Sequence, residues 1–135
     1  RAMCTPEGRG IGSVADDIFA LGTSLGVLMA GVNPLEKIEE YVSSIVDATR
    51  NPKNYDLELG DMIEFGASPR ASIWLILAAK ANALLAGRGF VIPDDIKSIA
   101  HDVLRHRIIL TFEAEAEGNT SDVLIDKILE KVRAP

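Results

Sequence analysis

The chain has 135 residues, 47% of them hydrophobic and 5% aromatic, which indicates one domain with an aliphatic, mainly helical interior. Its 14 basic and 20 acidic residues give a net charge of −6, which argues against a surface for nucleic acid or anionic membranes. The single cysteine, Cys4, excludes an internal disulfide, and no apolar run is long enough to span a bilayer. We therefore expect a cytoplasmic protein with no membrane insertion.

The first 33 residues are expected to form an N-terminal segment of separate character. Residues 1–11 are punctuated by Gly and Pro and should be loose, and because the chain begins at Arg1 rather than Met we expect a fragment. In residues 13–29, apolar side chains recur every three or four positions, which predicts one amphipathic helix. Residues 34–135 are then expected to form a helical domain.

The first helix of that domain is predicted from Pro34 to about Arg50. Asn33 is a suitable N-cap, and proline suits the first helical position because no N–H group is needed there. The apolar face of this helix is predicted to comprise Leu35, Ile38, Tyr41 or Val42, and Ile45. Residues 51–67 are interpreted as a loop, in which only 62–65 shows the alternation of a short strand.

The longest apolar stretch of the chain lies within residues 66–89. Every position of 73–79 is apolar, and Ala, Leu and Lys favour helix, so a helix of about five turns is predicted. Ser68 is its expected N-cap and Pro69 its first residue. A helix that is apolar almost all round should be covered on most sides, so we expect it to be the buried centre of the domain.

Two further helices are predicted toward the C-terminus. One begins at Pro93 with two carboxylates in its first turn, and the last covers 120–132. The buried side of the last helix is predicted to be Val123, Leu124, Ile128, Leu129 and Val132. The predicted fold class is all-α, a small bundle of about five helices with short extended segments near 62–65 and 108–112.

Several polar groups have simpler explanations than a site. His101 and His106 are five residues apart and do not share the helix face that a metal pair needs. Asp94 and Asp95 follow a proline, which explains them as helix-start residues rather than as an acid/base pair. Glu113, Glu115 and Glu117 lack the ligand spacing of a calcium loop and are interpreted as a solvated segment.

The remaining motifs assign no chemistry either. The cluster Arg105-His106-Arg107 is too small to bind nucleic acid unaided and is equally suited to contact an acidic neighbour. No Gly-rich phosphate-binding loop with its lysine is present, so the chain should not hydrolyse a nucleotide by itself. We therefore predict no catalytic residue and no metal ligand in this chain.

Arg70 is a basic residue at a position where a helix normally disfavours positive charge. It falls in the first turn of the long apolar helix, where the positive end of the helix dipole disfavours a cation. A phosphate would explain it, because the guanidinium fork binds phosphate oxygens in pairs. An exposed arginine paired with a nearby carboxylate is the simpler alternative, since a misplaced charge costs only about 0.3–1 kcal/mol.

From about Tyr41 onward the sequence resembles the C-terminal lid region of MoxR-type AAA+ ATPases. The matching segments, in the family's order and over roughly two-thirds of the chain, are YVSSIVDATR (41–50), GASPRA (66–71), AAKANALLAGR (78–88), FVIPDDI (90–96) and DVLRHRIIL (102–110). GASPRA before a long apolar helix is fairly specific, and the DVLRHR segment after it makes the match strong. Residues 1–33 do not match the pattern expected just before such a lid.

The resemblance implies a helical lid beside an ATP-binding core that this chain lacks. Arg70 corresponds to the family's sensor-2 arginine, positioned by Ser68 and Pro69, which would reach the terminal phosphates of ATP and couple the lid to nucleotide state. ATP and Mg²⁺ would belong to the complete protein, an ATPase, and none is expected bound to this fragment. The implied partners are the AAA+ core of the same polypeptide, further copies in a ring, and a protein client remodelled or assembled in a chaperone-like way.

Two other functions fit the residues. A free-standing helical adaptor would bind protein without nucleotide, and Arg70 would then serve an ion pair. A histone-like or helix-turn-helix DNA binder is suggested only by the IPDDI helix start at 92–96, and the net negative charge argues against it.

Overall fold

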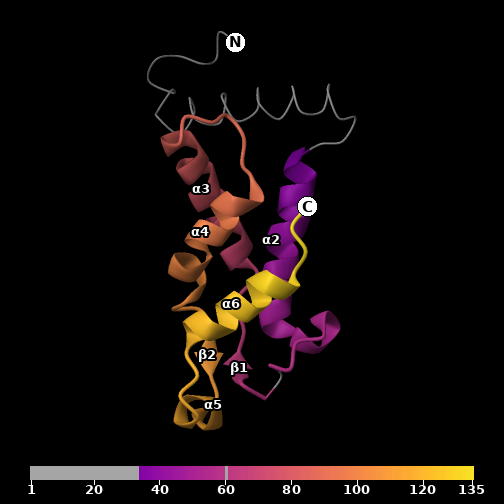
Figure 1. The fold of residues 1–135 in the computed structure, drawn as a ribbon, viewed down its shortest axis with the longest axis vertical. Helices are drawn as coiled ribbons and strands as arrows, with labels where there is room; N and C mark the ends of the chain where they lie inside the picture. The colour runs from indigo at the N-terminus through magenta and orange to yellow at the C-terminus, as the bar shows by residue number, and fades with distance from the viewer. Residues whose placement is uncertain (1–33, 60) are drawn as a thin grey trace.

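The computed structural model describes residues 34–59 and 61–135 (Figure 1). In chain order its elements are α2 (Pro34–Arg50), the 3-10 helix η2 (Pro52–Tyr55), β1 (Ile63–Phe65), α3 (Arg70–Leu85), α4 (Pro93–Leu104), β2 (Ile109–Leu110), α5 (Phe112–Ala116) and α6 (Ser121–Lys131). The predicted helix 13–29 and the N-terminal segment 1–33 lie outside the described residues. The described part is a helical bundle with one small sheet, which confirms the predicted fold class.

Helix α2 contributes more buried residues than any other helix of the described part, and it packs against α3, α6, β1 and η2. Its buried side includes the predicted Ile38 and Ile45, and both Tyr41 and Val42 are buried where the sequence left a choice. Helix α4 also lies against both α3 and α6. Helices α2 and α4 therefore each connect α3 to α6. The apolar periodicity of α2 therefore predicted its core face correctly.

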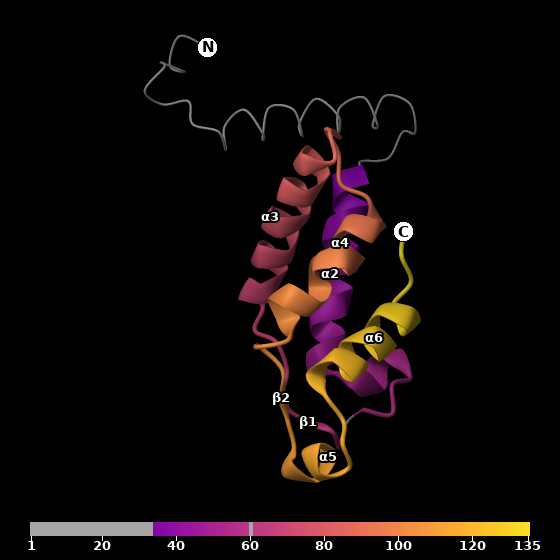
Figure 2. The same ribbon diagram turned by 60° about the vertical axis from the view of Figure 1, so that its left-hand side comes forward.

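Helix α3 is not the buried centre that its composition predicted. Its buried residues form a single stripe at four-residue spacing, made of small side chains and one leucine: Ala71, Leu75, Ala79 and Ala83. The small residues allow α3 to approach its neighbours closely along that stripe. The opposite face is exposed, and Figure 2 shows α3 along one side of the molecule rather than inside it. The apolar sequence of α3 predicted that the whole helix is buried, but it could not indicate which face of the helix this domain covers.

The two extended segments predicted from the sequence pair with each other. Strands β1 and β2 are antiparallel, with Ile63 opposite Leu110 and Phe65 opposite Ile109 and an irregularity between these pairs. The predicted segment 108–112 is extended only at its centre, because Thr111 Oγ1 accepts a hydrogen bond from Ala114 N at 3.3 Å and starts α5.

The acidic residues at 113–117 are exposed, as predicted for a solvated segment, and residues 112–116 form the short helix α5. The predicted buried side of the last helix is corrected at two positions. Val123 of α6 is 42% exposed, whereas Ile125, which the predicted buried side omitted, is fully buried. Among the described residues no helix is long and apolar enough to cross a membrane.

Candidate functional site

The turn between β1 and α3 places the residues that the sequence singled out. Pro69 already has helical backbone angles, φ −52° and ψ −26°, although α3 is assigned from Arg70. Ser68 Oγ accepts a hydrogen bond from the backbone N–H of Arg70 at 3.2 Å, and Ser68 O accepts one from Ala71 N at 2.8 Å. Ser68 thus acts as the N-cap and Pro69 as the first helical residue, because the cap oxygen binds an amide that no helical carbonyl reaches.

Arg70 is exposed at the beginning of α3, and its side chain has no hydrogen bond or ion pair to any other residue within the described part of the chain. Arg88 and Arg105, by contrast, form ion pairs with Asp95 at 2.6 Å and Asp122 at 2.7 Å. The local ion pair that would explain Arg70 most simply is therefore not formed there. A guanidinium beside the unpaired amides of a helix start is suited to an anion.

The exposed face of α3 continues from Arg70 as an apolar stripe. Positions 70, 73, 74 and 77 follow the spacing of one helix face. Ile73, Trp74 and Leu77 on that face are 58%, 52% and 48% exposed. We call Ile73, Trp74 and Leu77 the α3 stripe. The cation and the stripe therefore look out from the same side of the domain.

The turn that carries Arg70 is anchored at a buried point. The backbone N–H of Ala67 donates a hydrogen bond to Thr49 Oγ1 of α2 at 2.9 Å, and both residues are almost completely buried. Sequence reasoning passed over Thr49. A signal was available, because Val42, Ile45 and Thr49 follow one helical face and place a hydroxyl among core positions.

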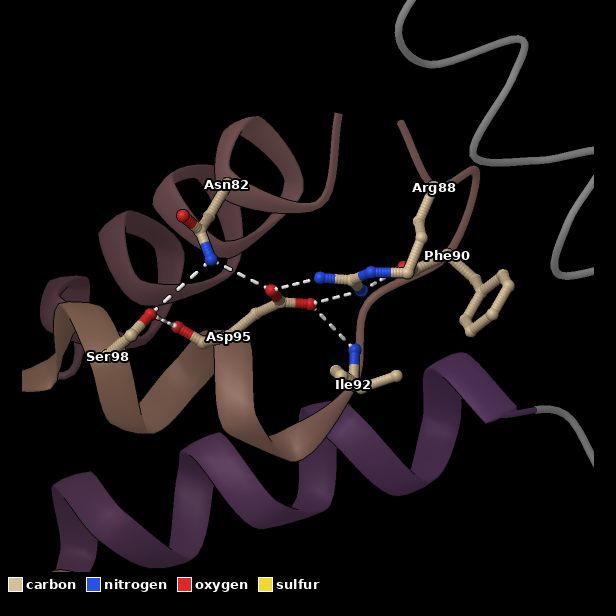
Figure 3. A network of polar contacts seen from close by, with 6 residues as sticks. All are labelled: Asn82, Arg88, Phe90, Ile92, Asp95 and Ser98. Carbon is tan, nitrogen blue, oxygen red and sulfur yellow. Dashed lines mark hydrogen bonds and ion pairs between the residues drawn. The ribbon is translucent and has the colours of Figure 1, made fainter. Parts of the chain in front are cut away.

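A second polar centre joins α3 to the start of α4 (Figure 3). Asp95 is 2% exposed and accepts hydrogen bonds from Arg88 Nη1 at 2.8 Å and Nη2 at 2.6 Å. Its carboxylate also accepts from Asn82 Nδ2 at 2.8 Å and from the backbone N–H of Ile92 at 2.9 Å. Arg88 Nη1 further donates to Phe90 O at 3.2 Å. One carboxylate thus fixes the end of α3, the connecting loop and the first turn of α4.

The electrostatics of Asp95 suit a structural role. Burial by itself raises the pKa of its carboxyl group, but the hydrogen bonds from Arg88, Ile92 and Asn82 outweigh that effect and hold the pKa below its ordinary value of 3.8. Asp94, its neighbour, is exposed. An ionised carboxylate locked to arginine does not exchange protons near neutral pH, so these aspartates do not form an acid/base pair.

Two of the other polar groups from the sequence, His101 and Arg105, likewise join elements, whereas His106 is exposed. His101 Nε2 lies 2.9 Å from Asp126 Oδ1 and links α4 to α6. In the 105–107 cluster, Arg105 pairs with Asp122, and Arg107 Nε donates to the carbonyl of Val103 at 3.0 Å. Within residues 34–59 and 61–135, no group of three acidic, His or Cys side chains could hold a metal ion. Arg70 has no such joining role within the described residues, and the α3 stripe is one of several exposed apolar groups there, which also include Leu85 and Phe112.

Comparison with known proteins agrees with this fold. The sequence profile of the AAA lid domain family matches residues 59–128. A crystal structure of a proposed ATPase from Cytophaga hutchinsonii superposes with a TM-score of 0.72 at 48% sequence identity, covering 74% of this chain and 31% of that one. Chaperone MoxR1 of Mycobacterium tuberculosis is 41% identical over 97 residues, 71% of this chain and 26% of the relative. Protein YeaC of Bacillus subtilis is 39% identical over 100 residues, 74% of this chain and 29% of the relative.

The chain belongs to the AAA lid domain family, because the family profile covers more than half of its length and the fold is the expected helical bundle. Its relatives include MoxR-type proteins, and with the family match they show a lid region of the MoxR-type AAA+ ATPase kind. The chain spans only 26% and 29% of the lengths of the MoxR1 and YeaC proteins and 31% of the Cytophaga protein.

Proposed function

We propose that this lid senses nucleotide through Arg70, which contacts the terminal phosphates of ATP held by an ATP-binding core of the same polypeptide. The observation that carries the proposal is the exposed guanidinium at the start of α3 with no partner in the described part of the chain. The hydrogen bond from Arg70 N to Ser68 Oγ, which caps the helix that Arg70 begins, supports the proposal. A positioned arginine stabilises the negative charge that develops in phosphoryl transfer.

The α3 stripe supports a core domain as its partner. Helices that are apolar all round are normally buried, yet Ile73, Trp74 and Leu77 are about half exposed here. The matched relatives are about three to four times as long as their shared region with this chain, so they contain ample further protein to cover such a face. Because the stripe begins beside Arg70, a core seated on it would bring bound nucleotide to the guanidinium.

The rest of the proposed mechanism follows from that contact. The complete protein binds ATP with Mg²⁺ in the core, and loss of the terminal phosphate removes the partner of Arg70, so the lid changes its orientation between ATP and ADP states. Repeated over a ring of identical subunits, this motion would remodel or assemble a protein client in a chaperone-like way. The named relatives include a chaperone of MoxR type, which supports the proposal.

The test is ATP turnover by the complete protein, whose reading frame upstream of residue 1 should encode a phosphate-binding loop. Replacement of Arg70→Ala should lower kcat by about 100- to 1,000-fold, the scale for removing one preorganised donor. The kcat of Arg70→Lys should lie between those of the unaltered protein and Arg70→Ala, because lysine keeps the positive charge but cannot form the paired hydrogen bonds of a guanidinium.

Arg133→Ala is the matched control, since Arg133 is also exposed and follows α6 near the C-terminus rather than beginning α3. Its turnover should match that of the unaltered protein. Unchanged turnover in Arg70→Ala, or an upstream reading frame without a phosphate-binding loop, would contradict the sensing role and favour the adaptor that binds protein alone.

A further inference from the structure

The lid holds the turn before Arg70 in place through a buried hydroxyl group on another helix. Thr49 lies in the last turn of α2 and is 1% exposed, one of two buried polar or charged residues in the described part of the chain. Its Oγ1 donates to Val46 O at 2.7 Å and accepts the backbone N–H of Ala67 at 2.9 Å. The first contact is a local helical one, whereas the second reaches a residue 18 positions further along the chain.

The turn also meets the backbone of the same threonine. A Cβ added at Gly66 would lie 2.3 Å from Thr49 O and 2.7 Å from Thr49 C. The next residue, Ala67, is fully buried, so its methyl group is enclosed by protein. Residues 66 and 67 are thus fixed to one point on α2 by a close backbone approach, a hydrogen bond and burial.

Little conformational freedom separates this anchor from Arg70. Only Ser68 and Pro69 intervene, and the proline ring restricts one of the two backbone torsions of Pro69. Ser68 closes the remaining step, because its Oγ accepts the Arg70 N–H. The position of Thr49 therefore determines where the Arg70 backbone stands relative to α2.

We infer that Thr49 is a positioning residue for Arg70: its hydroxyl anchors the 66–70 turn so that the guanidinium is presented at a fixed place to the nucleotide. This inference rests on the sensing role proposed above. It adds that the geometry of the sensor is set by α2, on the opposite side of the turn from the helix that carries Arg70. Misplacement of a group by about 1 Å is enough to lower a rate by about 100-fold.

Thr49→Val tests the anchor, because valine has nearly the same shape as threonine but cannot accept the Ala67 N–H. In the 135-residue chain, hydrogen exchange at the Ala67 amide should be slow for the unaltered protein, faster for Thr49→Val and slow again for Thr49→Ser, which restores the hydroxyl. Thr111→Val is the matched control, since its hydroxyl also joins two segments, Asp61 O and Ala114 N, without a hydrogen bond to residues 66–70. Equal Ala67 exchange in Thr49→Val and the unaltered chain would overturn the anchor.

ATP turnover by the complete protein tests whether the anchor serves Arg70. Thr49→Val should lower kcat by about 10- to 100-fold, and Thr49→Ser should stay within about twofold of the unaltered protein. In an Arg70→Ala background, Thr49→Val should have no further effect, because it acts through the arginine. A purely structural role would instead give the same fold-loss in both backgrounds, and that result would overturn the positioning role.

The two proposals fail in different ways. If Arg70→Ala turns over normally, the sensing role fails and the positioning role falls with it, even where Ala67 exchange responds to Thr49→Val. If Arg70→Ala is impaired but Thr49→Val is not, the sensing role stands and only the positioning role is wrong.

Discussion

Two glycines of this lid are required for different reasons. At Gly66 the requirement is space, because an added Cβ would meet the Thr49 carbonyl oxygen at 2.3 Å. At Gly87, which follows α3, an added Cβ would meet nothing within 4 Å, but the backbone has φ +74°, a left-handed conformation that favours glycine. Gly66 therefore belongs to the anchored turn, and Gly87 to the end of a helix.

Gly66→Ala should lower the free energy of unfolding by about 1–3 kcal/mol, the usual effect of crowding a packed site. It should also speed hydrogen exchange at Ala67, because the turn must move away from Thr49 to make room. Gly87→Ala should cost about 1–2 kcal/mol for the left-handed conformation and leave Ala67 exchange unchanged. Chemical denaturation and amide exchange of the two variants measure both effects; equal Ala67 exchange in both would contradict the crowding at Gly66.

At the scale of elements, the corner between α3 and α4 depends on one buried carboxylate. Asp95 collects donors from α3 (Asn82), the connecting loop (Arg88) and the α4 start (Ile92) (Figure 3). Because a buried charge is tolerated only when it is well paired, removing any donor leaves the others less well satisfied. This corner thereby ties the end of α3 and the connecting loop to the start of α4.

Asp95→Asn should lower the free energy of unfolding at pH 7 by about 1.5–3 kcal/mol, the scale of hydrogen bonds to a charged group. The folded protein holds the pKa of Asp95 below 3.8, so the carboxylate contributes stability above that pH and loses it as pH falls through 3.8 toward the lower folded value. Unfolding measured from pH 7 to pH 2 should therefore show a steeper acid loss in the unaltered protein than in Asp95→Asn.

Asp94→Asn is the matched control, because Asp94 is exposed in the same helical turn. It should cost less than about 1 kcal/mol, the usual size of a helix-dipole contribution. An equally large loss in both variants would show that the general charge of the α4 start matters rather than the network around Asp95.

At the scale of the whole molecule, α3 is apolar on two faces, only one of which the described part of the lid covers. One face is the buried stripe that packs within the lid, with Leu75 fully buried. The other is the α3 stripe, about half exposed and continuous with Arg70. The lid therefore folds with one side of α3 and presents the other, which is the arrangement expected of a domain that works against a larger body.

The same leucine-to-alanine substitution, made once on each face of α3, distinguishes the roles of the two faces. Leu75→Ala should destabilise the 135-residue chain by about 2–5 kcal/mol, because a buried leucine leaves a cavity. Leu77→Ala, at a position 48% exposed, should change its stability by less than about 0.5 kcal/mol. In the complete protein, however, Leu77→Ala should reduce ATP turnover and expose the lid to limited proteolysis, because it would weaken the proposed contact with the core. Full turnover and unchanged proteolysis in Leu77→Ala would argue against core docking on this face.

The sequence by itself determined the elements that depend on neighbours within a few residues. Helices α2, α4 and α6 follow from apolar spacing and from their starting residues, and the Ser68–Pro69 start of α3 follows from capping chemistry. The resemblance carried by GASPRA and DVLRHR also pointed to the lid family without any coordinates. The helix predictions succeed because periodicity and capping are local properties of the chain, and the resemblance succeeds because it rests on short sequence motifs.

Only the tertiary structure decided which surfaces meet. It gave α2 rather than α3 the larger buried face, paired β1 with β2, and joined Thr49 to Ala67 and Arg88 to Asp95. A uniformly apolar helix such as α3 has no periodicity from which to tell its covered face from its exposed one. The Thr49–Ala67 contact links residues far apart in the chain, so no local pattern predicts it; it exists because the turn is folded back against α2.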